Sequence, residues 1–227
     1  MDYSVELYKN KILSTFDWIK KAHFFIPFGT CCLPAETFKN LRLRKFALPL
    51  DWLFTTNSML SHCMEDNFET LLDRENYIFV PPHERPWGEN YSFCHHKFYR
   101  DSHGANFVFN HFNPIETEIY SKMKRRVERM NAVLNSKEWK SFFNFSHNSC
   151  NKNDFRSLYD SINGRTKNFS LVNISYRGLR SDGPLIENLE FIDSSVHFEY
   201  YSSSRFCGPN FESERDNSII NSIFYAN

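Results

Sequence analysis

Helix-like and strand-like patterns alternate through the second half of the chain, and this alternation restricts its fold more than any other feature. Residues 116–139 carry apolar side chains three or four positions apart, the spacing of one helix face. After them, 141–147 predict a strand, 153–163 a helix and 168–177 another strand. We therefore expect an α/β fold, in which a central, largely parallel sheet is flanked by helices.

The first half of the chain predicts a strand, a turn and a helix in close succession. Residues 4–22 have helical spacing, and HFFIPF (23–28) is typical of a short buried strand that ends at Gly29. A helix is expected over 33–41, with Pro34 tolerated in its first turn. A further helix is expected over 61–72.

The middle and the end of the chain give weaker patterns. Residues 74–110 are rich in aromatic residues, histidine and proline, and we interpret them as an insert within a single domain of residues 1–227. Short strands are expected at 77–80 and 105–112, one or two edge strands within 189–201, and a closing helix at 216–226.

The composition excludes several classes of function. Lys plus Arg equals Asp plus Glu at 27 each, so no basic field attracts nucleic acid. No apolar run has the length of a membrane span and the N-terminus lacks a secretory pattern, so we expect a cytoplasmic protein. The six cysteines are scattered without a CxxC pair, which predicts free thiols, no zinc site and no cofactor.

Two adjacent cysteines, Cys31 and Cys32, follow the turn at Gly29. In an α/β sheet this turn lies at the carboxyl edge, where such folds bind ligands. The positive end of the next helix favours thiolate over thiol there, and glycine permits a sharp turn. Either cysteine is a candidate nucleophile, although a buried thiol that packs like a small apolar group is the commoner case.

The segment GTCCLPAETFKNLRLRKFALPLDWLF (29–54) resembles the signature of the putative papain-like cysteine peptidases (domain of unknown function 1796), whose members often lie in polysaccharide or capsule gene neighbourhoods. The matching positions are Gly29, Cys32, Ala35, Phe38, Leu43, Arg44, Lys45, Pro49, Leu50, Asp51 and Trp52. This resemblance selects Cys32 as the nucleophile. It also implies an alternative α+β papain-like fold, with Cys32 at the start of a central helix.

The resemblance implies a histidine partner as well. Family members carry a histidine shortly before a basic helix, and His111 takes that position, followed by Phe112 where Asp is usual. His111 would act as base and acid. Asp51 lies in an apolar segment, where a carboxylate needs a partner; it either orients the histidine or binds a substrate hydroxyl, or it forms a salt bridge with Arg44.

Other residues are candidates for substrate binding. Backbone amides from Thr30 to Cys32 would hold an oxyanion, Arg44 would contact an anionic substrate, and Trp52 is either a core residue or a substrate platform. The cluster of Cys94, His95, His96 and His103 offers an alternative base or, less in keeping with its spacing, a metal site. The substrate-binding candidates are Gly29, Thr30, Arg44, Trp52, His95 and His96.

Together these features predict a cysteine-dependent acyl hydrolase or acyltransferase that acts on a peptide or on a glycan-linked acyl or amide group. The alternative is a catalytically inactive carbohydrate-binding or protein-binding module on the same fold. The expected partner is a small-molecule, glycan or peptide substrate, without nucleic acid or a membrane span. The sequence leaves the oligomeric state open.

Overall fold

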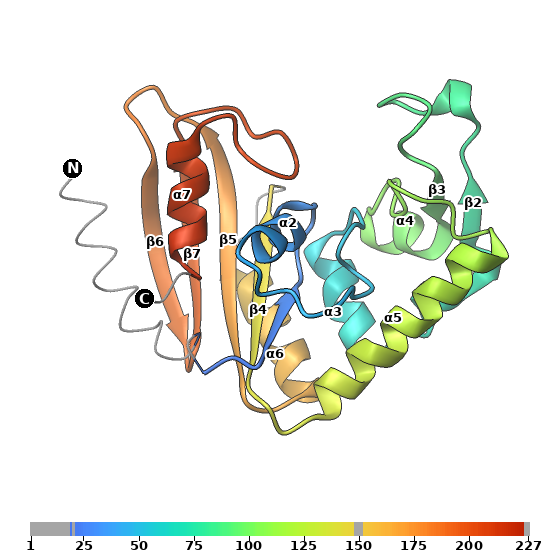
Figure 1. Cartoon of the computed structure of the whole chain (residues 1–227), viewed down its shortest axis with the longest axis horizontal. Helices are drawn as coiled ribbons and strands as arrows, with labels where there is room; N and C mark the ends of the chain where they lie inside the picture. The colour runs from blue at the N-terminus through green and yellow to red at the C-terminus, as the bar shows by residue number, and fades with distance from the viewer. Residues whose placement is uncertain (1–18, 20, 148–151, 225–227) are drawn as a thin grey trace.

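The computed structural model describes residue 19 and residues 21–147 and 152–224 (Figure 1). Of the helix expected over 4–22, all but residues 19, 21 and 22 lie outside the described residues. Within the described part, a five-stranded sheet has the strand order β1-β4-β5-β7-β6. Its strands are β1 (Phe24–Pro27), β4 (Lys140–Ser146), β5 (Phe169–Leu179), β6 (Leu185–Ile192) and β7 (Ser195–Ser202).

The first four strands of this order are parallel, and only β6 runs antiparallel, at one edge. This arrangement confirms the α/β fold predicted from the alternating patterns. β4 is buried along its whole length because it lies between β1 and β5 with helices on both sides. Its Phe142 faces one side of the sheet and Phe143 the other, as the pleat of a strand requires.

Helices cover both faces of the sheet, and each face has its own hydrophobic core. The helices are α2 (Leu33–Asn40), α3 (Asn57–Glu65), α4 (Lys97–His103), α5 (Thr117–Asn135), α6 (Lys152–Arg165) and α7 (Glu214–Ser222). The apolar faces of α3, α5 and α6 pack on one side of the sheet, while those of α2 and α7 pack on the other. In Figure 1, α5 runs diagonally from the part with β2 and β3 to the start of β4.

The insert contains less strand than the sequence predicts. β2 (Tyr77–Phe79) pairs with β3 (Cys94–His96), so the first short strand is confirmed. The prediction of a strand over 105–112 is wrong, since this segment contains only an isolated bridge at Phe109. Phe107 has a positive φ of 49°, and the next two residues bond to different segments, Val108 O to Phe54 N and Phe109 to Cys94. A run with such diverging partners cannot form a ladder.

Two other expectations also need correction. The helix expected over 61–72 begins earlier, as α3 at Asn57, and it ends at Glu65 because Asn67 and Phe68 both have positive φ. The strands within 189–201 are not both at an edge, since β7 lies between β5 and β6. Its residues Val196, Phe198 and Tyr200 fill the core on one face, and neighbours pair on both sides.

No helix in the described ranges is long and apolar enough to cross a membrane.

Candidate active site

The corner between β1 and α2, residues Gly29–Leu33, places the two adjacent cysteines. Beyond the end of β1 the chain continues beside β4, with Phe28 N donating to Phe143 O at 2.8 Å and Thr30 N to Phe145 O at 3.1 Å. A Cβ atom on Gly29 would lie 2.5 Å from Pro34 Cγ and 3.1 Å from Phe145 N. Gly29 is not among the residues with positive φ. The glycine is therefore required for space between β4 and α2, and not for a left-handed turn.

Cys32 is the N-cap residue of α2, but its side chain forms no capping hydrogen bond. The residue is only 5 % exposed. Burial, and to a smaller extent the negative charge of Glu36, raise the pKa of the Cys32 thiol to about 12. The expectation that the helix start favours a thiolate is therefore wrong for the resting protein, because burial raises the pKa of the thiol.

Cys31 points into the core on the α2 and α7 side of the sheet. It is 4 % exposed, burial raises the pKa of its thiol, and the amide of Leu33 donates a hydrogen bond to its sulfur. These contacts make Cys31 a packed structural thiol.

The structure brings Cys32 and His111 together from positions 79 residues apart, with 3.2 Å between Cys32 Sγ and His111 Nε2. This is within the hydrogen-bond distance for sulfur. Partial desolvation lowers the pKa of His111 below its usual value. With the thiol pKa raised and the imidazole pKa lowered, the resting pair is a neutral thiol hydrogen-bonded to a neutral ring.

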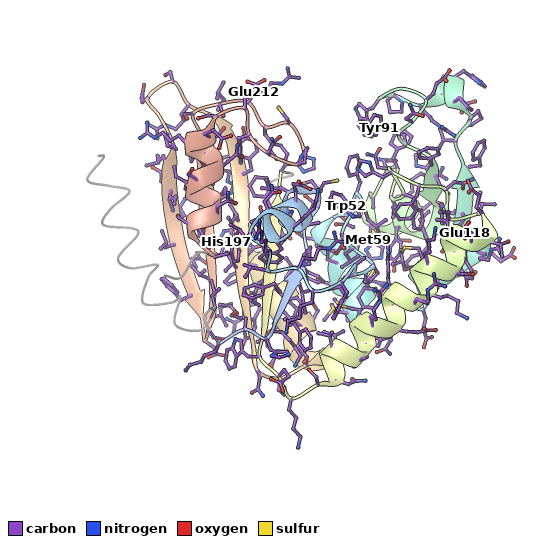
Figure 2. All side chains as sticks on the ribbon, viewed as in Figure 1. Trp52, Met59, Tyr91, Glu118, His197 and Glu212 are labelled. Atoms are coloured by element: carbon purple, nitrogen blue, oxygen red, sulfur yellow. The ribbon has the colours of Figure 1, made fainter. Side chains whose placement is uncertain are left out.

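Three aromatic rings surround His111 and account for its desolvation. Trp52, Phe54 and Tyr91 meet the imidazole edge to face, at centroid distances of 6.1, 6.4 and 5.7 Å. Figure 2 shows Trp52 near α2 and Tyr91 on the loop before β3, in the upper half of the view. Tyr91 is 44 % exposed and His111 itself is exposed, so the imidazole remains open to solvent on one side.

Asp51 is 1 % exposed and forms a salt bridge with Arg44 at 2.6 Å. The same oxygen, Oδ2, accepts a hydrogen bond from Leu48 N at 3.0 Å, whereas Oδ1 has no partner among the described residues. Arg44 lies over the ring of Trp52 at 5.8 Å. Asp51 is thus linked to His111 through Arg44 and Trp52. In the described part of the chain no hydrogen bond joins the carboxylate to the imidazole.

Thr30 is tied to the end of β4. Its hydroxyl donates to Phe145 O at 3.2 Å and lies 3.2 Å from His147 Nδ1, and its amide also donates to Phe145 O. The amide of Thr30 is therefore not available to an oxyanion, contrary to the expectation for the whole Thr30 to Cys32 segment.

His95 and His96 lie on β3, and their nitrogens bond to the insert itself and to Thr70, just before it. The buried ring of His96 contacts Thr70 O through Nε2 and accepts from Tyr99 N through Nδ1. His95 Nδ1 accepts from Phe107 N, and its ring lies against Phe107 at 4.2 Å. These contacts give both histidines structural roles. No group of three or more metal-binding side chains occurs within the described ranges.

Sequence reasoning missed several neighbours of the pair. Asn110 Nδ2 lies 3.3 Å from His111 Nε2, and Phe54 and Tyr91 contact the imidazole. His147 stands at the end of β4 beside Thr30. Of these residues, only Asn110 could have been suspected from the sequence, because it directly precedes His111. The other residues come from segments that the fold alone brings together.

One of three comparisons with known proteins identifies a family. Residues 23–175, more than half of the chain, match the model of a family described as "Putative papain-like cysteine peptidase (DUF1796)". A search of curated proteins and a search of solved structures gave no significant match. The matched range includes the corner, Cys32, His111 and strand β4. The chain therefore belongs to the family of putative papain-like cysteine peptidases.

Proposed function

We propose that the protein is a cysteine-dependent acyl hydrolase or acyltransferase that acts on a peptide or on a glycan-linked acyl or amide group. The single observation that supports this most strongly is the 3.2 Å contact between Cys32 Sγ and His111 Nε2 at the carboxyl edge of the sheet. A thiol and a base at hydrogen-bond distance form the minimum pair for nucleophilic acyl transfer.

The proposed reaction begins from the neutral pair. His111 Nε2 takes the proton of the Cys32 thiol while the sulfur attacks the carbonyl carbon of the substrate. The oxyanion that forms is assigned to the amides of Cys31 and Cys32, since the amides of Thr30 and Leu33 donate to Phe145 O and to the sulfur of Cys31. His111 then gives its proton to the leaving group, and a thioester on Cys32 remains.

A second nucleophile completes the cycle. Water, or the hydroxyl or amine of an acceptor, attacks the thioester carbonyl while His111 removes its proton. The Cys32–carbonyl bond breaks and the thiol regains a proton from His111. Hydrolysis and transfer differ only in this second nucleophile, so the same two residues serve either reaction.

The surroundings of His111 support a substrate with an apolar or ring-shaped part near the carbonyl. Trp52, Phe54 and Tyr91 surround the imidazole, and Trp87, which is 54 % exposed, packs on Phe54 at 5.4 Å. Aromatic faces pack well on aliphatic side chains and on the apolar faces of sugars. The aromatic rings near His111 therefore suit both a peptide substrate and a glycan-linked acyl group.

A second candidate function is that of a binding module without catalysis. It is favoured by the burial of Cys32 and its raised thiol pKa, which leave the resting thiol un-ionised. The exposed rings of Tyr91 and Trp87 would then serve binding alone.

One experiment separates these functions. The purified protein is incubated with chromogenic acyl esters, peptide amides and acylated sugars, with and without amine acceptors, and acyl groups on Cys32 are sought by mass spectrometry. We expect Cys32→Ala to lower the rate by roughly a thousandfold or more. The matched control, Cys31→Ala, removes the neighbouring packed thiol and retains activity. Full activity of Cys32→Ala would refute a thiol nucleophile. Binding without turnover in the wild type and in Cys32→Ala would favour the binding module.

A further inference from the structure

Asn110, which directly precedes the proposed base, is held in one orientation. The residue is 4 % exposed, and its Oδ1 accepts from Ser92 N at 2.9 Å. Ser92 Oγ lies 3.4 Å from the same oxygen. Ser92 N also donates to the backbone oxygen of Asn110 at 2.8 Å, and because this N–H can only donate, the oxygen of the amide faces it as a second acceptor. The reversed orientation would bring two donors together in a buried place.

This orientation leaves the amide nitrogen facing the imidazole. Asn110 Nδ2 lies 3.3 Å from His111 Nε2. An amide NH₂ group can only donate, so Nε2 of the neutral ring must accept and the ring proton must lie on Nδ1. Cys32 Sγ lies 3.2 Å from the same Nε2, and its S–H is therefore the second donor to this nitrogen.

We propose that Asn110 is a positioning residue, which holds His111 in the tautomer with its proton on Nδ1 and so leaves on Nε2 the lone pair that accepts from both the Asn110 amide and the Cys32 thiol. This inference rests on the function proposed above. Asn110 touches neither sulfur nor substrate in the proposed reaction and acts only through the imidazole.

The same contact makes His111 a weaker base and a stronger acid. When Nε2 receives the thiol proton, its new N–H faces the hydrogens of the Asn110 amide, and this repulsion favours release of the proton to the leaving group. Among the described residues, the titratable groups that face His111 are Cys32 from the corner and Tyr91 from the loop before β3. Its other neighbours, Trp52, Phe54 and Asn110, carry no charge.

The tautomer is measured directly by NMR of the full chain with ¹⁵N-labelled histidine, with the His111 signals assigned through a His111→Gln variant. Above the pKa of His111, we expect the wild-type ring to carry its proton on Nδ1. Cys32→Ala removes the thiol donor but leaves Asn110, so the same tautomer should persist. A wild-type ring protonated on Nε2, or a switch to that form in Cys32→Ala, would overturn the proposal without any variant at Asn110.

Asn110→Asp tests the donor itself. Its carboxylate can still accept from Ser92 but can no longer donate to the ring, so the proton should move to Nε2 and the pKa of His111 should rise by about one unit or more. The matched control is Asn113→Asp, which adds the same charge two residues beyond His111 and keeps the acceptor for Ile115 N. Equal spectra and equal pKa values in the two variants would refute the role of Asn110.

These readouts do not depend on catalysis. A tautomer as expected together with an activity that is independent of Cys32 would refute the proposed function alone. An activity that requires Cys32 together with an Nε2-protonated ring would refute only the role of Asn110.

Discussion

At Asp51, the two oxygens of one carboxylate have opposite surroundings. Oδ2 binds Arg44 and Leu48 N, whereas Oδ1 is buried without a partner among the described residues. A carboxylate that is only half satisfied is costly to bury. Burial accordingly raises the pKa of Asp51 from 3.8 to about 6, against the opposing effect of Arg44, because protonation removes the unpartnered charge.

The raised pKa predicts how stability depends on pH. A carboxyl whose folded pKa exceeds its unfolded pKa contributes stability at low pH, and this contribution is lost as pH rises through about 6. Urea unfolding of the wild type and Asp51→Asn should therefore show a wild-type advantage that grows as the pH falls from about 7 to about 5. A difference between the two proteins that stays constant, or shrinks on acidification, would contradict the raised pKa.

Single residues show how far the sequence could lead. The burial of Cys31 and the pairing of Asp51 with Arg44 were among the alternatives that the residue types allowed, and the structure contains both contacts. The proximity of Cys32 and His111 came from the family resemblance, since no local pattern joins residues 79 positions apart. The prediction of a thiolate at Cys32 was wrong because the exposure of its sulfur depends on packing by distant segments, which no local pattern reveals.

At the scale of elements, the corner depends on the small size of Gly29. A methyl group at this position meets Pro34 at the start of α2 and the backbone of β4, neither of which can move freely. Gly29→Ala should therefore lower the free energy of unfolding by about 1–3 kcal/mol. Because the clash displaces the start of α2, which carries Cys32, activity should fall by roughly tenfold to a hundredfold.

The matched control for this prediction is Gly164→Ala in α6, where an added Cβ meets no atom within 4 Å. This variant should be as stable as the wild type or slightly more stable, since alanine favours a helix. Denaturant unfolding and the chromogenic assay measure both effects. Equal behaviour of the two variants would show that the space at Gly29 is not limiting.

Helices and strands whose apolar side chains recur at regular spacing could be predicted, whereas segments without such spacing could not. The stripe of α5 and the apolar strands β1, β4 and β5 gave clear patterns, and each is present near its expected place. The run at 105–112 has a strand-like composition, but its backbone groups bond to separate segments. Composition carries no information about which partner a backbone group meets.

At the scale of the whole molecule, the alternation of helix and strand was enough to predict the parallel sheet, because a right-handed crossover leaves few other arrangements. It was not enough to predict the strand order. β7 lies inside the sheet because the chain first forms edge strand β6 and then returns to pair with β5, a choice decided by packing on both faces.

The parallel sheet also determines the position of the proposed active site. It places the corner after β1 at its carboxyl edge, and the insert and the segment before α5 bring Tyr91 and His111 to that corner. We propose that these distant segments convert the buried thiol of Cys32 into a nucleophile that depends on His111 for its proton transfer.

The most direct test is the pH dependence of iodoacetamide alkylation at Cys32, followed by peptide mass spectrometry, in the wild type and in His111→Gln. The exposed thiol of Cys207 serves as an internal reference. Since partial desolvation lowers the pKa of His111 below its ordinary value, the wild-type rate should increase with pH only in the acidic range where the ring loses its proton, and should then stay level. His111→Gln should remove the rise and slow Cys32 by roughly a hundredfold, with Cys207 unchanged. Equal rates at Cys32 in both proteins across this range would contradict the account.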